Sequence, residues 1–104
     1  MAQPHFWNDH SGRLTFSQAG VDSAEYPDLC RAIVQAFDLQ PAGNLAAGME
    51  QVFCDFCKGD ELIGIDWDIW MEFMVVAKSK SAEPLVREIG QWVAEGGMKR
   101  PKES

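Results

Sequence analysis

Residues 62–77 constrain the fold of this chain more than any other segment, because their side chains alternate with a period of two. Apolar residues occupy one parity: Ile63, Ile65, Trp67, Ile69, Met71, Phe73, Val75 and Ala77. The other parity carries three carboxylates around an indole: Asp66, Asp68, Trp70 and Glu72. This alternation is typical of a β-strand with one buried and one exposed face. Sixteen residues are many for one strand, so the pattern also allows a break near residues 66–68.

A second strand is expected over residues 49–58, followed by a turn at residues 58–61 that folds it back on the first. With Gly59 and Asp60 as the loop residues, the apolar side chains of the two strands face one another: Phe56 with Ile63, Cys54 with Ile65, and Val52 with Trp67. The same register pairs the other parity: Phe53 with Asp66, Asp55 with Gly64, and Gln51 with Asp68. The sequence therefore predicts a hairpin with one apolar face and one acidic, aromatic face.

Two amphipathic helices are expected to cover the apolar face. Ser23 caps the first and Ser81 caps the second, while Pro41 and Gly43 end the first and Gly96 follows the second. Their apolar residues recur at helical spacing: Leu29, Cys30, Ile33, Val34 and Phe37 in the first, and Leu85, Val86, Ile89, Trp92 and Val93 in the second. Stripes of this kind pack one side of a helix onto a core.

The remaining segments complete an α+β prediction for a single domain of residues 1–104. A short strand is expected at residues 13–17, an N-terminal arm at 1–12, a loose connection at 40–48 and a disordered tail at 98–104. The expected architecture is a two-layer sandwich in the order β-α-β-β-α, with an antiparallel sheet of three to four strands and both helices on one face. The expected core joins the apolar parity of residues 63–73 to Leu14, Phe16, Leu29, Ile33, Phe37, Val52, Cys54, Phe56, Leu85, Ile89 and Trp92.

The net charge of the chain indicates which classes of partner it can bind. Nine Lys and Arg residues against sixteen Asp and Glu residues give a formal net charge of -7. Such a chain repels phosphate backbones and anionic membranes and attracts basic proteins. No apolar run approaches 18 residues, and no basic start precedes an apolar stretch of the secretory kind. We therefore expect a cytoplasmic protein that binds neither nucleic acid nor membranes directly.

The sequence contains no motif that names a reaction. Cys54 and Cys57 have a Cys-x-x-Cys spacing, but a strand points residues three apart to opposite faces. We therefore interpret Cys54 as a small core residue and Cys57 as an incidental cysteine. His5 and His10 are the only histidines, and both lie in the arm. Asp66 and Asp68 share a face, yet Glu72 lies too far along a continuous strand to join them around one ion. We expect no enzymatic activity, no metal and no cofactor.

The acidic, aromatic face is the candidate binding site. Its residues are Phe53, Asp55, Asp66, Asp68, Trp70 and Glu72. Exposed aromatic residues among acids are typical of protein interfaces, and they predict a basic protein partner. The alternative is that the arm, with Phe6 and Trp7, covers this face.

In size, acidity and expected layout the chain is similar to small bacterial immunity and inhibitor proteins that neutralise a basic surface of a toxin. That similarity implies an inhibitory, protein-binding role. Two alternatives stay open. The chain could be a self-associating accessory or structural subunit, for example a homodimer, or an enzyme with an unrecognised site.

Overall fold

The computed structural model describes residues 4–47 and 51–96, with the backbone alone for residues 44–47. The disordered tail predicted at residues 98–104 lies outside this part of the chain. The elements are β1 (His5–Asn8), β2 (Leu14–Gln18), α1 (Tyr26–Phe37), β3 (Gln40–Ala47), β4 (Gln51–Lys58), β5 (Glu61–Asp68), β6 (Glu72–Ala77), a short 3-10 helix (Lys80–Ala82) and α2 (Glu83–Ala94). The six strands form one antiparallel sheet in the order β1-β2-β6-β5-β4-β3.

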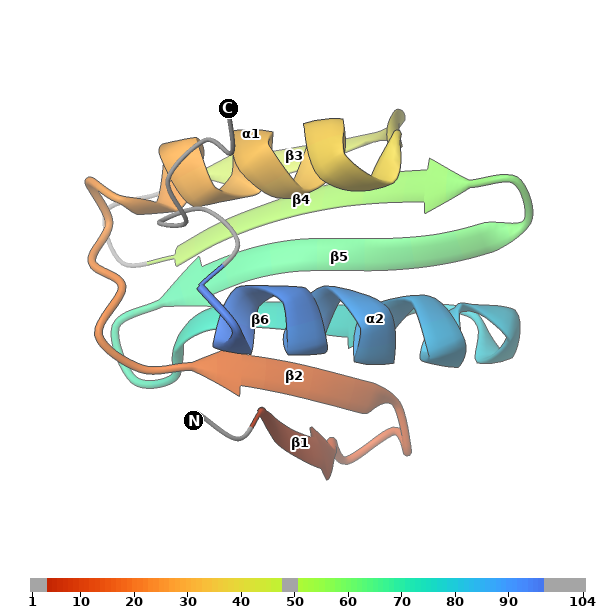
Figure 1. Cartoon of the computed structure of the whole chain (residues 1–104), viewed down its shortest axis with the longest axis horizontal. Coiled ribbons are helices and arrows are strands. Elements are labelled where there is room, and N and C mark those ends of the chain that lie inside the picture. The colour runs from red at the N-terminus through yellow and green to blue at the C-terminus, as the bar shows by residue number, and fades with distance from the viewer. Residues whose placement is uncertain (1–3, 48–50, 97–104) are drawn as a thin grey trace.

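Both helices lie on the same face of the sheet, as Figure 1 shows, and this confirms the α+β class and the predicted layering. The side chains of Phe16, Ile63, Ile65, Phe73 and Ile89 are fully buried between the two layers. Two hydrogen bonds attach the segment around α1 to β5. The Trp67 indole N–H donates to the Val21 carbonyl at 2.8 Å, and the Tyr26 hydroxyl donates to the Ile65 carbonyl.

The predicted number of strands, three to four in the order β-α-β-β-α, is wrong. One additional strand is β1, within the segment expected to be an arm. It pairs with β2 because Phe6 packs on Phe16, with ring centroids 5.8 Å apart, and because the Arg87 guanidinium lies 5.4 Å from the centre of the Phe6 ring. Aromatic and cation–π contacts of this kind hold a short edge strand in place.

A second additional strand is β3, where a loose connection was expected. Helix α1 ends at Phe37, earlier than Pro41 and Gly43 suggested, because Asp38 adopts a left-handed conformation with φ 57°. The chain is thereby released to pair with β4 from Gln40 onward. Pro41 and Gly43 are accommodated because β3 is an edge strand with a register shift between Pro41 and Leu45.

The helix starts also differ from the prediction. Asp22, not Ser23, organises the start of α1: Asp22 Oδ1 accepts the Glu25 N–H at 2.9 Å, and Glu25 Oε1 accepts the Asp22 N–H at 3.1 Å. This reciprocal pair satisfies two backbone donors, as in a capping box. Helix α2 follows directly on the short 3-10 helix, and its cap residue is Ala82 instead of Ser81. Neither helix in residues 4–47 and 51–96 has the length and apolarity needed to cross a membrane.

Gly90 lets α2 approach the sheet closely. A Cβ atom at this position would lie 2.7 Å from Phe16 Cδ1 and 2.8 Å from the Phe6 ring. Gly90→Ala is expected to destabilise the protein by about 1 to 3 kcal/mol, because overpacking exceeds the roughly 1 kcal/mol that alanine gains in helix propensity. Urea denaturation measures the difference. In a Phe6→Ala background, Gly90→Ala should destabilise the protein less. An unchanged destabilisation would show that Phe6 does not set the distance between α2 and the sheet.

Candidate functional site

The segment 62–77 turns back on itself instead of running as one strand. Strand β5 ends at Asp68, β6 begins at Glu72, and Ile69, Trp70 and Met71 form the turn between them. Asp68 Oδ1 accepts the backbone N–H groups of Trp70 at 2.9 Å and Met71 at 2.6 Å. A side-chain carboxylate that binds the backbone two and three residues further on initiates a turn. The break predicted near residues 66–68 is therefore placed just after Asp68.

We call Ile69, Trp70 and Met71 the apolar turn. Ile69 and Met71 were expected in the core, and this prediction is wrong: their exposed fractions are 45% and 40%, and that of Trp70 is 71%. They lie in the connection between β5 and β6, not within either strand. Three consecutive large apolar side chains are thus presented to solvent, the kind of surface that marks an interaction site.

The base of the apolar turn is held by Asp68 and Glu72, which pair directly across β5 and β6. Glu72 has a left-handed backbone conformation with φ 61°, which is uncommon for a residue with a side chain. Its carboxylate oxygen Oε1 accepts the backbone N–H of Gly20, at the end of β2. Both carboxylates therefore bind backbone donors that fix the shape of the turn, so they position Trp70 in addition to contributing charge.

The helix-free face of the hairpin has the predicted register. Phe53 pairs with Asp66, Asp55 with Gly64 and Gln51 with Asp68. Phe53 is exposed, whereas Asp55 and Asp66 are each only 6% exposed. Thr15, Met74 and Val76 are also buried on this face, although they were not among the residues singled out in the sequence. On this face the aromatic part of the predicted surface, Phe53, is exposed, whereas the predicted exposure of Asp55 and Asp66 is wrong.

Gly64 explains why two carboxylates are buried side by side. A Cβ atom at Gly64 would lie 2.8 Å from Lys78 Cε, 3.1 Å from Asp66 Oδ1 and 3.3 Å from Asp55 Oδ1. All three side chains thus converge above this glycine. The Lys78 ammonium pairs with Asp55 Oδ1 at 2.8 Å. The space left by the missing side chain is filled by an ion pair and a second carboxylate.

The Asp66 carboxyl of this cluster is strongly affected by its burial. Burial raises the pKa of Asp66 to about 6, and the positive charge of Lys78 opposes this rise. Its Oδ1 atom has no hydrogen-bond partner within residues 4–47 and 51–96. A buried carboxylate without full pairing favours its neutral form. Lys78 offsets the negative charge of Asp55, and the raised pKa of Asp66 favours its neutral form. The helix-free face is therefore less negative than the sequence indicated.

The described part of the N-terminal arm, from Pro4 onward, does not cover the candidate residues. Strand β1 extends the sheet at its edge beside β2, and three strands separate it from β4, which carries Phe53. The Trp7 indole N–H donates to Ser17 Oγ at 3.1 Å, which places Trp7 over β2. Phe53 and Trp70 are therefore left accessible.

The remaining sequence candidates lie apart from one another. Cys54 and Cys57 are in β4 as predicted, with no disulfide, and burial raises the pKa of the Cys54 thiol and takes that of Cys30 to about 11. A raised pKa leaves little reactive thiolate at neutral pH. His5 and His10 are exposed. Across the part of the chain that the structure describes, no three His, Cys, Asp or Glu side chains are grouped as a metal site.

The features brought together are an apolar turn of fixed shape and, on the helix-free face, an exposed aromatic ring. Comparison with models of known protein families, with curated proteins and with solved structures finds no match to this chain.

Proposed function

We propose that this protein is a non-enzymatic binding module that docks on a basic protein partner through the apolar turn. The observation that carries the proposal is the exposure of Ile69, Trp70 and Met71 on a backbone held by Asp68 and Glu72. A preformed loop loses little conformational entropy on binding, and tryptophan is enriched among residues that dominate interface energies.

The net charge of -7 supports a basic partner, because opposite charge accelerates association and disfavours acidic competitors. An inhibitor or immunity-type role, in which the protein covers a basic surface of its partner, is the form of this proposal that fits the small size of the chain. The unpaired thiols Cys30, Cys54 and Cys57 support a location in the reducing cytoplasm.

The test is affinity purification from the native cell with the wild-type chain and a Trp70→Ala variant as paired baits. A specific partner should be retained by the wild-type chain, lost or reduced with the variant, and released by salt. With the isolated partner, Trp70→Ala should weaken binding by about 2 kcal/mol or more, through faster dissociation. Surface plasmon resonance measures both rate constants.

Phe53→Ala is the matched control, because it also removes an exposed aromatic ring but leaves the turn unchanged. It should change the affinity less than Trp70→Ala. A partner that binds both Trp70→Ala and the wild-type chain with the same dissociation rate would contradict the proposal.

Self-association is the second candidate, and the same exposed turn favours it. A second copy of the chain would bury the apolar turns of both protomers, which a two-fold interface does symmetrically. Sedimentation equilibrium over a range of protein concentrations separates the two functions. A dimer that disappears in Trp70→Ala would support self-association, and a monomer at all concentrations would support the basic partner.

A further inference from the structure

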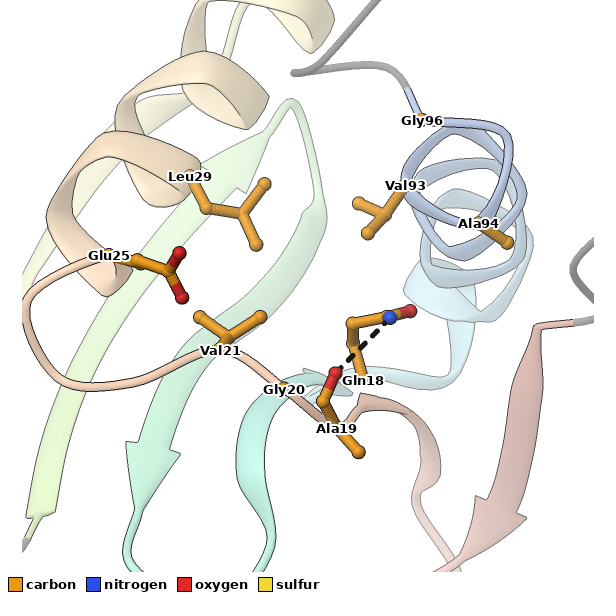
Figure 2. A pocket seen from close by; sticks show the side chains of 9 residues that line it. All are labelled: Gln18, Ala19, Gly20, Val21, Glu25, Leu29, Val93, Ala94 and Gly96. Carbon is orange, nitrogen blue, oxygen red and sulfur yellow. Dashed lines mark hydrogen bonds between the residues drawn. The ribbon is translucent and has the colours of Figure 1, made fainter.

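A cavity of about 230 Å³ lies between the start of α1 and the end of α2, above the segment that leaves β2. Figure 2 shows Val21, Leu29 and Val93 as its walls. Set against the roughly 30 Å³ that one water molecule occupies in the liquid, the volume accommodates about seven non-hydrogen atoms. The cavity is partly open to solvent, so a side chain or a small ligand has a path into it.

Glu25 is the charged residue among those that line the cavity, and its carboxylate accepts hydrogen bonds. In Figure 2 the Glu25 carboxylate points into the space between Val21 and Leu29. Its Oε1 atom accepts one hydrogen bond from the Asp22 N–H, and a carboxylate has capacity for several more. The Gln18 side-chain amide already donates to the Ala19 carbonyl at 3.3 Å, as the dashed line shows. An occupant that carries N–H donors and a positive charge therefore matches the Glu25 carboxylate.

The end of α2 adds to this polarity. Val93 and Ala94, in the last turn of α2, line the cavity, and that turn contains no basic residue. The negative end of the helix dipole is therefore not compensated by a side chain of its own helix. A positively charged group in the cavity would meet this end of α2 and the carboxylate of Glu25.

We propose that this cavity binds an alkylammonium group, namely a lysine side chain of the basic partner. The methylene stem lies against Val21, Leu29 and Val93, and the ammonium group donates to the Glu25 carboxylate. Long charged side chains bury their stems in apolar surroundings in this way. The assignment of the ammonium group to a partner rests on the proposed function, whereas the chemistry of the site does not.

The position of the cavity suits a second anchor beside the apolar turn. Gly20 lines the cavity and donates its N–H to Glu72, which holds the turn. Val21, a wall of the cavity, accepts the indole N–H of Trp67 in β5, just before the turn. Figure 1 places the turn between β5 and β6, the start of α1 and the end of α2 at the same end of the molecule. One partner surface could therefore reach the turn and the cavity together.

The test uses three probes of equal chain length: n-pentylammonium, n-pentanol and pentanoate. Methyl NMR signals of Val21, Leu29 and Val93 are followed during titration of the full-length protein. The ammonium probe should shift them saturably, with an affinity about tenfold above that of the alcohol, because it makes a charge-assisted hydrogen bond. Pentanoate should not bind. Equal binding of pentanoate, or no saturable shift with n-pentylammonium, would overturn the proposal.

Glu25→Gln removes the charge but keeps the geometry, because glutamine also fits a capping box. In this variant the ammonium probe should bind no better than the alcohol. Glu88→Gln, the same change at an exposed position of α2 that does not line the cavity, should preserve the tenfold preference. An unchanged preference in Glu25→Gln would show that Glu25 does not hold the ammonium group.

Trp70→Ala separates this site from the proposed function. If the variant loses the partner but retains the ammonium preference, both proposals stand. If the ammonium probe fails to bind while Trp70→Ala still weakens the partner, the cavity site alone is wrong. If the probe binds and no partner depends on Trp70, the proposed docking is wrong and the alkylammonium site remains, without its assignment to a partner.

Discussion

Trp67→Ala is expected to lower the free energy of unfolding by about 3 to 5 kcal/mol, the range of a buried aromatic residue truncated to alanine. Trp67 is 7% exposed, pairs with Phe73 across the sheet, and donates its indole N–H to Val21. The substitution leaves a cavity between the layers and an unpaired carbonyl at the start of the segment that leads to α1. Such a loss is a large part of the stability of an ordinary domain.

Trp70→Ala is the matched control, since the same substitution three positions further on removes a ring that is 71% exposed. Its unfolding midpoint in urea should differ little from that of the wild-type chain. If Trp70→Ala destabilises the protein as much as Trp67→Ala, Trp70 is buried and the apolar turn is not available for a partner. An unchanged midpoint for Trp67→Ala would remove Trp67 from the core.

Asp66→Asn is expected to stabilise the protein by about 2 to 3 kcal/mol above pH 6 and to have little effect below pH 4. Burial raises the pKa of Asp66 from 3.8 to about 6, so the folded state retains a proton that the unfolded state has lost in this interval. Stability falls with rising pH wherever the folded state binds more protons, by about 1.4 kcal/mol for each pH unit. Asparagine cannot ionise, so the stability of the variant does not fall through this process as the pH rises.

The measurement is the free energy of unfolding of both proteins by urea denaturation between pH 3.5 and pH 8. The two curves should converge at low pH and separate as pH rises through the interval from 4 to 6. A difference that does not change with pH would mean that Asp66 ionises with an ordinary pKa in the folded protein.

Asp55→Asn, at the neighbouring carboxylate, is expected to lower the stability of the protein, whereas Asp66→Asn raises it. Its partner Lys78 is 24% exposed, and the pair spans 2.8 Å. Removal of the Asp55 charge leaves the ammonium group without its ion-pair partner in a half-buried place, and this should cost about 1 to 3 kcal/mol at neutral pH. A stabilising effect of Asp55→Asn would indicate that Lys78 neutralises Asp66 in preference to Asp55.

The hairpin of β4 and β5 was predictable because the residues that determine it are neighbours in the sequence. Gly59 and Asp60 mark a two-residue turn, which sets the register that joins Phe56 to Ile63, and the alternation of the flanking residues agrees with it. A break was allowed near residues 66–68, but the exposure of Ile69 and Met71 in a turn was not predicted. The alternation continues through the turn, because three loop residues leave Trp67 and Phe73 on the same face. Neither glycine nor proline marks the turn, and its only local signal is the side chain of Asp68.

The burial of Asp66 could not be predicted, because it depends on residues from different strands. Asp55, Gly64 and Lys78 come together only after β4, β5 and β6 are in register. Strand β3 was missed for a related reason. Pro41 and Gly43 are typical of loops, and only the open edge of β4 makes a strand of that segment.

The two edges of the sheet are poorly suited to pairing with a strand of another chain. Strand β1 has only four residues, and β3 carries Pro41, which has no N–H group, and a shifted register around Gly43, whose φ is 92°. Short or irregular margins give another chain no continuous row of backbone groups to extend. Open-ended fibril growth by strand addition is thereby disfavoured, although the protein exposes a tryptophan in the apolar turn.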